Sequence, residues 1–138
     1  IGEIKMYRTL LTIFFVFACT PSFAGKFQFS FTWDGLFMCN TGNPNNVQNP
    51  EFTLKNVPKG TKWIYFKMTD LDVPNYNHGG GWAKYDGGNK IKKGQFWYAS
   101  PCPPSGSHTY EWKATATKKK SLSGTAVLRQ AHSSKRYP

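Results

Sequence analysis

Two segments of the chain alternate regularly between hydrophobic and polar residues, which is the pattern of a β-strand with one buried face. In residues 26–33 every second side chain is aromatic, and the polar positions between the aromatic ones are Gln28, Ser30 and Thr32. Residues 108–116 repeat the pattern, and one face of this segment carries His108, Tyr110, Trp112, Ala114 and Ala116. Each segment is therefore expected to form a half-buried strand.

Shorter runs predict the rest of the fold. Four of them fit further strands: 52–54, 63–69, 82–85 and 95–99. The run 63–69 is apolar on both faces, as expected of a central strand. Residues 40–50 are rich in Asn, Gly and Pro, so we expect a loop and not a strand there. Residues 122–131 fit either a final strand or a short helix. The pattern predicts an all-β, mainly antiparallel domain with little helix, built as a two-sheet sandwich.

The N-terminal residues have the pattern of a secretory signal peptide. Lys5 and Arg8 form a short basic region, and an apolar run follows at 10–18. Residues 22–24 then place Ser and Ala at the two small-residue positions of a cleavage site before Gly25. The apolar run is too short to span a bilayer comfortably. We therefore expect a Sec signal peptide with upstream residues at 1–24 and a single domain at 25–138.

Two alternatives to this signal peptide remain. The segment could be a buried N-terminal element, or Cys19 could be the lipid-attachment site of a lipoprotein, although Phe17 fits that pattern poorly. Residues 1–5 precede Met6, which fits a start of translation, and they are excluded from the fold prediction. The favoured interpretation places the protein in the periplasm or outside the cell.

Charge and cysteine content change this picture in two ways. Without residues 1–24 the chain keeps 16 Lys and Arg and 6 Asp and Glu, a formal net charge of +10. It also keeps two cysteines, Cys39 and Cys102. In an oxidising compartment two cysteines indicate one disulfide, and the alternative is a pair of free thiols. The bond would close a loop of about 60 residues and stabilise the domain by about 3–4 kcal/mol.

The candidate chemistry lies in two segments about thirty residues apart. Residues 68–74 read Met-Thr-Asp-Leu-Asp-Val-Pro and follow the expected strand 63–69. Residues 98–110 are rich in proline and lead into the expected strand 108–116. Each segment combines rigid turns with ionisable groups, so that the two could meet at one end of a sheet and form a small polar pocket. The predicted function depends on that meeting.

These two segments resemble the phosphatidylethanolamine-binding protein family, which includes the Raf kinase inhibitor-like proteins. Residues 70–74 resemble the family's Asp-Pro-Asp-x-Pro signature, which also follows a strand. Residues 101–110 resemble its Gly-Pro-x-Pro-x-Gly-x-His-x-Tyr region. The resemblance runs from about 27 to 116, and residues 77–81 and 135–138 look more like a short exported bacterial branch. It implies a Greek-key sandwich and a pocket for anions such as phosphate head groups.

The sequence departs from the family pattern at several positions. Leu71 replaces the usual proline between the aspartates, and Thr109 replaces the usual arginine after the histidine. The usual His-Trp pair is absent, and His78 followed by glycines lies nearby instead. The chain is short and shows no counterpart of the family's C-terminal helix. These departures concern the identity of the ligand more than the fold.

On the residues themselves, a phosphate pocket needs hydrogen-bond donors on a rigid backbone. His108 and Tyr110 are two residues apart on one strand face and can both donate. Prolines would stiffen the rim, and backbone amides at 105–107 could add an anion nest. Asp70 and Asp72 could orient the histidine or accept hydrogen bonds from loop amides. The expected ligand-binding residues are Asp70, Asp72, Pro74, His78, Pro103, Pro104, Gly106, His108 and Tyr110. Each also has a purely structural interpretation, as loop organiser, core residue or exposed side chain.

We therefore expect an exported protein that binds a small anionic ligand bearing phosphate or carboxylate, with no catalytic residues, no cofactor and no metal. A regulatory or inhibitory protein target is a further candidate partner, because the family includes such regulators. Three alternatives stay open: a hydrolase using His108 and Asp70, a metal site built from Asp70, Asp72 and His78 or His108, and a basic binder of the anionic membrane surface. Nucleic acid is not expected as a partner, since an exported protein seldom meets it. The hydrolase would lack a Gly-x-Ser-x-Gly elbow.

Overall fold

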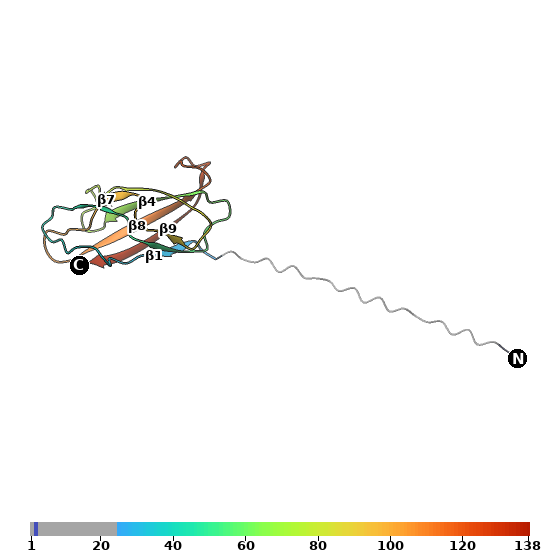
Figure 1. The fold of residues 1–138 in the computed structure, drawn as a ribbon, viewed down its shortest axis with the longest axis horizontal. Coiled ribbons are helices and arrows are strands. Elements are labelled where there is room, and N and C mark those ends of the chain that lie inside the picture. The colour runs from blue at the N-terminus through green and yellow to red at the C-terminus, as the bar shows by residue number, and fades with distance from the viewer. Residues whose placement is uncertain (1, 3–24) are drawn as a thin grey trace.

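The computed structural model describes residue 2 and residues 25–138, and all structural statements below concern these residues. The expected signal peptide falls outside this part of the chain. The described residues form nine strands and no helix, so the all-β class is confirmed (Figure 1). The strands are β1 (Gln28–Ser30), β2 (Asn46–Gln48), β3 (Phe52–Lys55), β4 (Trp63–Asp70), β5 (Gly80–Lys84), β6 (Lys90–Ile91), β7 (Trp97–Ala99), β8 (His108–Thr117) and β9 (Val127–Tyr137).

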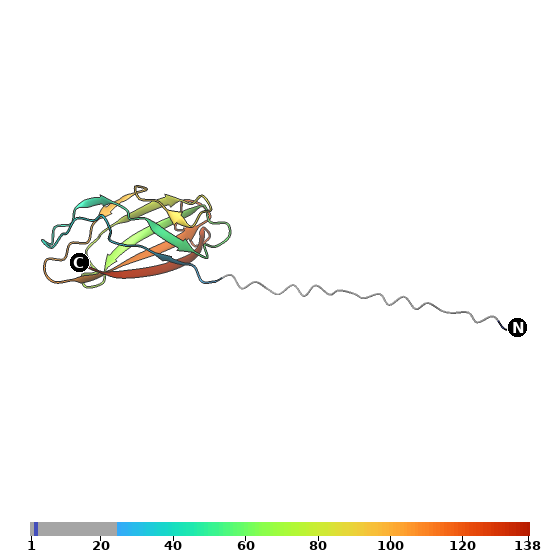
Figure 2. The ribbon, with the colours of Figure 1, turned by 60° about the horizontal axis from the view of Figure 1, so that its bottom comes forward.

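One layer of the domain is a four-stranded antiparallel sheet in the order β5-β4-β8-β9. Its two longest strands, β8 and β9, run along most of the domain, as Figures 1 and 2 show. The central strand β4 pairs with β8 over its whole length, from Trp63 opposite Thr117 to Asp70 opposite Tyr110. The strand is therefore central, as expected, but only one of its faces is buried: Ile64, Phe66 and Met68 lie in the core, whereas Lys67 on the other face is exposed.

The remaining strands form two small sheets, β1-β3-β6 and β2-β7, where the sequence pattern predicted a single second sheet. Strand β7 lies beside the entry of β5, because the amide of Ala99 donates to the carbonyl oxygen of His78 at 2.8 Å. Aromatic rings from β1 and β3 meet the four-stranded sheet in one core. Phe52 of β3 stacks on Phe66 of β4, with ring centroids 4.0 Å apart, and meets Trp112 of β8 edge-on at 5.3 Å. Phe29 contacts Phe52 and Phe66 edge-on. The alternating aromatic face of residues 26–33 is thus the part of the core that β1 supplies.

The prediction that residues 40–50 form only a loop is wrong for 46–48, which form β2. Val47 lies opposite Tyr98 in the β2–β7 pair, and Asn46 and Gln48 are exposed. The side chain of Asn49 is fully buried and accepts hydrogen bonds from the amides of Gln95 and Phe96 at 2.7 and 3.0 Å. Tertiary contacts therefore override the turn-forming tendency of this Asn-rich segment.

Two further features resolve or extend the sequence pattern. Residues 127–137 form the long strand β9, so a strand and not a helix follows the basic turn at 118–120.

Gly80 has φ +152°, and a Cβ atom there would collide with the backbone of Phe66 on the neighbouring strand β4. A glycine is required at this position because β5 lies so close to β4. Within the described part of the chain, no helix is long and apolar enough to cross a membrane.

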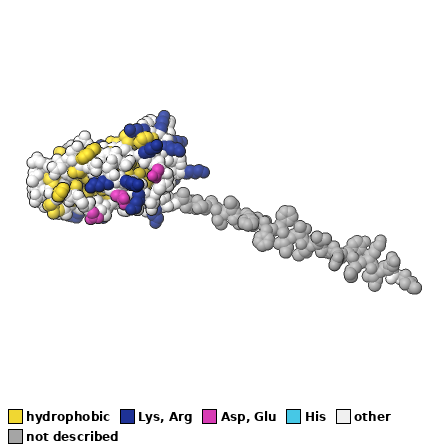
Figure 3. All heavy atoms as spheres, viewed as in Figure 1, with side chains coloured by type: hydrophobic (Ala, Val, Ile, Leu, Met, Phe, Trp, Pro, Cys, Tyr) yellow, Lys and Arg dark blue, Asp and Glu magenta, His cyan; other side chains and the backbone are white. Residues whose placement is uncertain are grey.

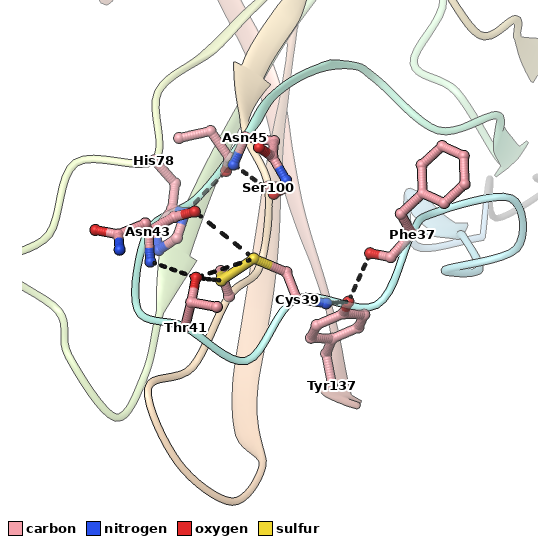
Figure 4. The surroundings of a disulfide bond; sticks show 10 residues. Phe37, Cys39, Thr41, Asn43, Asn45, His78, Ser100 and Tyr137 are labelled. Carbon is pink, nitrogen blue, oxygen red and sulfur yellow. Dashed lines mark hydrogen bonds between the residues drawn. A yellow bond between two sulfur atoms is a disulfide. The ribbon is translucent and has the colours of Figure 1, made fainter.

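Cys39 and Cys102 form a disulfide, as the sequence predicted. The bond ties the loop before β2 to the proline-rich segment before β8, and its two cysteines are 63 residues apart in the chain. Thr41 belongs to this loop and lies against the bond, with its hydroxyl 3.5 Å from the sulfur of Cys102 (Figure 4). A disulfide is consistent with a location outside the cytoplasm.

Replacing both cysteines, Cys39→Ala with Cys102→Ala, should lower the free energy of unfolding by about 4 kcal/mol, because the unfolded chain gains the entropy of a 63-residue loop. Chemical denaturation of the oxidised protein and of the variant measures this difference. Reduction should destabilise the unmodified protein by a similar amount and leave the variant unchanged. A loss below about 1 kcal/mol would show that the loop is held without the bond.

Candidate ligand-binding cavity

The end of β4 and the start of β8 lie side by side because the two strands are antiparallel. Asp70 is opposite Tyr110 in this register, and the amide of Leu71 donates to the carbonyl oxygen of Thr109 at 2.8 Å. The two polar segments that the sequence singled out therefore meet at one end of the four-stranded sheet. A cavity of about 220 Å³ opens at this meeting point.

Asp70 organises the wall of this cavity. One of its carboxylate oxygens accepts hydrogen bonds from the amides of Asp72 and Val73, at 2.9 and 3.2 Å. The other oxygen lies 2.7 Å from Nδ1 of His108. The side chain of Asp70 is 5% exposed and that of His108 is 15% exposed. Asp70 thus shapes the turn after β4 and orients the imidazole at the same time.

Two opposing effects act on the pKa of Asp70. Burial by itself would raise the pKa, because a carboxylate loses hydration. The hydrogen bonds from His108 and from the amides of Asp72 and Val73, together with the charge of His108, outweigh burial and hold the pKa below its ordinary value. Asp70 is therefore an ionised and fully hydrogen-bonded carboxylate at neutral pH.

His78 also lines the cavity, and its protonation at neutral pH differs from that of Asp70. It is 3% exposed, and its Nδ1 lies 2.9 Å from the carbonyl oxygen of Ala99. Burial lowers the pKa of His78, although the contacts with Ala99 and Ser100 and the charge of Asp70 act in the other direction. A neutral ring whose Nδ1–H donates to Ala99 leaves Nε2 as an acceptor. His78 can therefore accept a hydrogen bond from a ligand but does not supply positive charge at neutral pH.

Tyr110 and Tyr76 supply the aromatic surfaces near these histidines. Tyr110 is 1% exposed, and burial together with the negative charge of Asp70 raises the pKa of its phenol. The phenol is therefore a neutral hydroxyl that can donate. Tyr76 packs against His78 with ring centroids 4.6 Å apart, and its outer part is exposed. One side of the cavity thus carries donors and the rim carries an aromatic ring.

Five of the residues that the sequence proposed for the pocket line this cavity: Asp70, His78, Pro104, His108 and Tyr110. The other four do not line it. Asp72 accepts a hydrogen bond from the amide of Thr109 at 2.7 Å and so joins the two segments. Pro103 is buried, and Pro74, Ser105 and Gly106 are exposed, whereas Ser107, the last residue of the expected nest, is half-buried.

The sequence analysis did not propose the remaining lining residues for the pocket: Gly42, Pro44, Val73, Tyr76 and Cys102. Gly42 and Pro44 belong to the loop that the disulfide ties against the proline-rich segment (Figure 4). The predicted Cys39–Cys102 bond was the signal that could have placed this loop beside the cavity, because it fixes residue 39 next to residue 102. Val73 and Tyr76 follow Asp70 in the turn and carried no separate signal.

Comparison with solved structures gives matches over most of the chain. A phosphatidylethanolamine-binding protein homologue from Chlamydia trachomatis matches with a TM-score of 0.56 and 15% identity, covering 81% of this chain and 97% of that one. Escherichia coli YbcL, described as a new member of the mammalian family of these proteins, matches with a TM-score of 0.51 and 16% identity, covering 82% and 98%. The domain has the phosphatidylethanolamine-binding protein fold. No family model and no curated protein sequence matches the chain.

The resemblance drawn from residues 70–74 and 101–110 is thus confirmed at the level of the fold. Because the identities are 15% and 16%, the matches show the fold alone. In this domain the cavity lies where the two signature-like segments meet.

The alternative of a metal site can be tested against the geometry of the same residues. Ligand atoms of Asp70, Asp72 and His108 lie within 4.8 Å of one another, and these atom types suit a hard or borderline cation. The hydrogen bonds described above already occupy both oxygens of Asp70, one oxygen of Asp72 and Nδ1 of His108. A cation bound to Nδ1 of His108 would have to displace the hydrogen bond between His108 and Asp70. The arrangement therefore favours carboxylates that hold backbone, and we propose no metal there.

The free energy of unfolding should fall in two stages as the pH is lowered. Below about pH 6.5, the ordinary pKa of histidine, the unfolded chain takes up a proton at His78 that the folded protein binds less readily, so stability falls until the folded pKa is reached. The stability that Asp70 contributes is fully present above its ordinary pKa of 3.8 and is lost as the pH falls through its lower folded pKa. Urea denaturation as a function of pH measures both stages.

Two variants assign these stages. His78→Gln should remove the first stage and Asp70→Asn the second, whereas His132→Gln should leave both, since His132 is exposed on β9. Persistence of the first stage in the His78 variant would contradict the assignment.

Proposed function

We propose that this cavity binds a small anionic head group that carries phosphate or carboxylate, and that the protein does so outside the cytoplasm. The observation that carries the proposal is the Asp70–His108 pair. The 2.7 Å contact at Nδ1 fixes the imidazole, so its other nitrogen, Nε2, is available to the cavity that His108 lines. A protonated imidazole held in this way offers Nε2–H as a charged donor.

The size of the cavity limits the ligand. Pockets for drug-sized molecules usually measure roughly 300–1,000 Å³. A cavity of about 220 Å³ is smaller and accepts a head group rather than an entire lipid. The phenol of Tyr110 can add a second donor, and the formal net charge of +10 on residues 25–138 attracts anions from a distance. Size, donors and overall charge therefore support the same class of ligand.

Binding is proposed in preference to catalysis because of what lines the cavity. A hydrolase that formed a covalent intermediate with His108 as the base would need a nucleophilic side chain within hydrogen-bond reach. Ser105 is exposed in the proline-rich turn, and Cys102 is held in the disulfide. The cavity-lining residues therefore offer no serine, threonine or free thiol to activate. A regulatory protein target remains compatible with a ligand-binding cavity at the end of the sheet.

Titration with inorganic phosphate and with phosphoethanolamine tests the proposal. Isotope-labelled protein should show saturable chemical-shift changes confined to residues 42–44, 70–78 and 100–110. His108→Ala should weaken binding at least tenfold, because a charged hydrogen bond of about 1.5–3 kcal/mol is lost.

The matched control is His132→Ala, because His132 also pairs with a carboxylate, Glu111 at 3.0 Å, but lies on the exposed face of β9. This control should bind both ligands as the unmodified protein does. Binding that survives in the His108 variant, or shifts spread over the surface lysines and abolished by salt, would refute an anion site in the cavity.

A second candidate function rests on the turn between β8 and β9. Lys118, Lys119 and Lys120 are exposed there, next to Leu122, whose side chain is 51% exposed. The backbone amide of Lys62 donates to Thr117 at 2.8 Å, which brings another lysine to the same end of the domain. Figure 3 shows Lys and Arg side chains gathered at this end. A basic turn with one exposed leucine suits weak contact with an anionic lipid surface.

Vesicle binding measures this second candidate. Replacing Lys118 and Lys119 by Gln should weaken binding to vesicles of anionic phospholipid about 30-fold, from about 1 kcal/mol for each lysine. The control replaces Lys113 and Lys135 by Gln, the same change of charge on β8 and β9 at a distance from the turn. Equal losses in both double variants would mean that only net charge matters and that the turn has no special role.

A further inference from the structure

A second hollow, separate from the cavity, lies between residues 30–37 and the β2–β7 pair. Its volume is about 570 Å³, and it shares no lining residue with the cavity at the end of β4. It is an open groove with a floor that includes the buried residues Phe31 and Tyr98. Its volume falls within the range of about 300–1,000 Å³ that is usual for ligand sites.

The charges around this groove differ from those of the rest of the domain. Residues 25–138 contain 6 acidic and 16 basic residues. Two of the acidic residues, Asp34 and Glu51, line the groove, but Lys93 is the one basic residue that does. Glu51 is paired with Lys90 at 2.6 Å, which compensates its charge. The groove is therefore a nearly neutral surface on a strongly basic protein, and it gives an anionic ligand little reason to bind there.

Two large aromatic side chains stand exposed beside the groove. Trp97 is 57% exposed and Phe37 is 90% exposed. The backbone around Phe37 is nevertheless held in place, because Tyr137 donates its hydroxyl to the carbonyl oxygen of Phe37 at 3.0 Å and accepts from the amide of Cys39 at 2.8 Å. Figure 4 shows the ring of Phe37 pointing away from this anchor. The backbone that carries this ring is thus held in place before any ligand arrives, so binding costs less backbone entropy.

Polar side chains lie next to these rings. Gln48 is opposite Trp97 in the β2–β7 register, so its amide and the indole share one face of the sheet. Asn46 and Asp34 are exposed and line the same groove. The buried side chain of Asn49 bonds to the backbone on both sides, including Pro50 at 2.8 Å and Lys92 at 3.1 Å, and stiffens the groove wall. The groove is thus lined by flat aromatic rings together with planar amide and carboxylate groups.

We propose that this groove binds a neutral oligosaccharide. A sugar ring has one face of C–H groups, which packs on an aromatic ring, and a rim of hydroxyls, which both donate and accept hydrogen bonds. Trp97 and Phe37 supply the faces, while Asp34, Asn46 and Gln48 supply partners for the hydroxyls. A purely apolar ligand would leave these polar groups buried without partners, which is costly. The groove chemistry therefore selects a ligand that is apolar on its faces and hydroxylated at its edges.

Titration with neutral hexaoses tests this site. The probes are β-1,4-linked glucose, α-1,4-linked glucose and β-1,4-linked N-acetylglucosamine, added to isotope-labelled protein at millimolar concentration. At least one should shift the amides of residues 34–37, 45–48 and 97 and change the fluorescence of Trp97. Trp97→Ala should weaken binding about tenfold by removing one stacking face, and Trp97→Phe should restore most of it.

Two controls separate this site from the others. Leu122→Ala removes an exposed side chain at the basic end of the domain and should leave sugar binding unchanged. The Trp97 variants should bind phosphate as the unmodified protein does, because Trp97 does not line the cavity at the end of β4. The proposal is overturned if none of the three hexaoses shifts the groove amides, or if Trp97→Ala binds as the unmodified protein does.

Discussion

The antiparallel pairing of β4 with β8 is the constraint on which the rest of this structure depends. Its register places Phe66 and Trp112 in the core and, at one end, sets Asp70 opposite Tyr110. The same ladder thus builds the interior and the candidate cavity. A shift of one residue would turn every side chain of one strand to the other face and separate His108 from Asp70. Packing of the aromatic core therefore protects the geometry of the polar site.

The cavity itself depends on a balance between burial and hydrogen bonding at Asp70. A buried carboxylate without partners would be costly, but His108 and the amides of Asp72 and Val73 compensate for the lost water. Because these partners come from both polar segments, the carboxylate stabilises the turn and orients the imidazole together. His78, held neutral by burial and oriented by its contact with Ala99, completes a site with one charged pair and one neutral ring.

The two candidate sites differ because they are built by different parts of the fold. The cavity lies where strands of the large sheet end, and ionisable groups there are held by backbone. The groove lies between residues 30–37 and the β2–β7 pair, where aromatic and amide side chains are exposed. The sequence pattern did not predict β2, which supplies one side of this surface.

The sequence by itself determined the all-β class and the main strands β1, β4 and β8, because alternating and continuous apolar runs are local patterns. It also determined the pairing of Cys39 with Cys102, because residues 25–138 contain two cysteines. It also indicated that the segments around Asp70 and His108 would meet. Only the tertiary structure decided that 46–48 form a strand and that Gly42 and Pro44 wall the cavity. It likewise decided that Asp72 joins segments and does not line the cavity. These outcomes depend on contacts between residues far apart in the chain, such as Asn49 with Phe96, which no local pattern encodes.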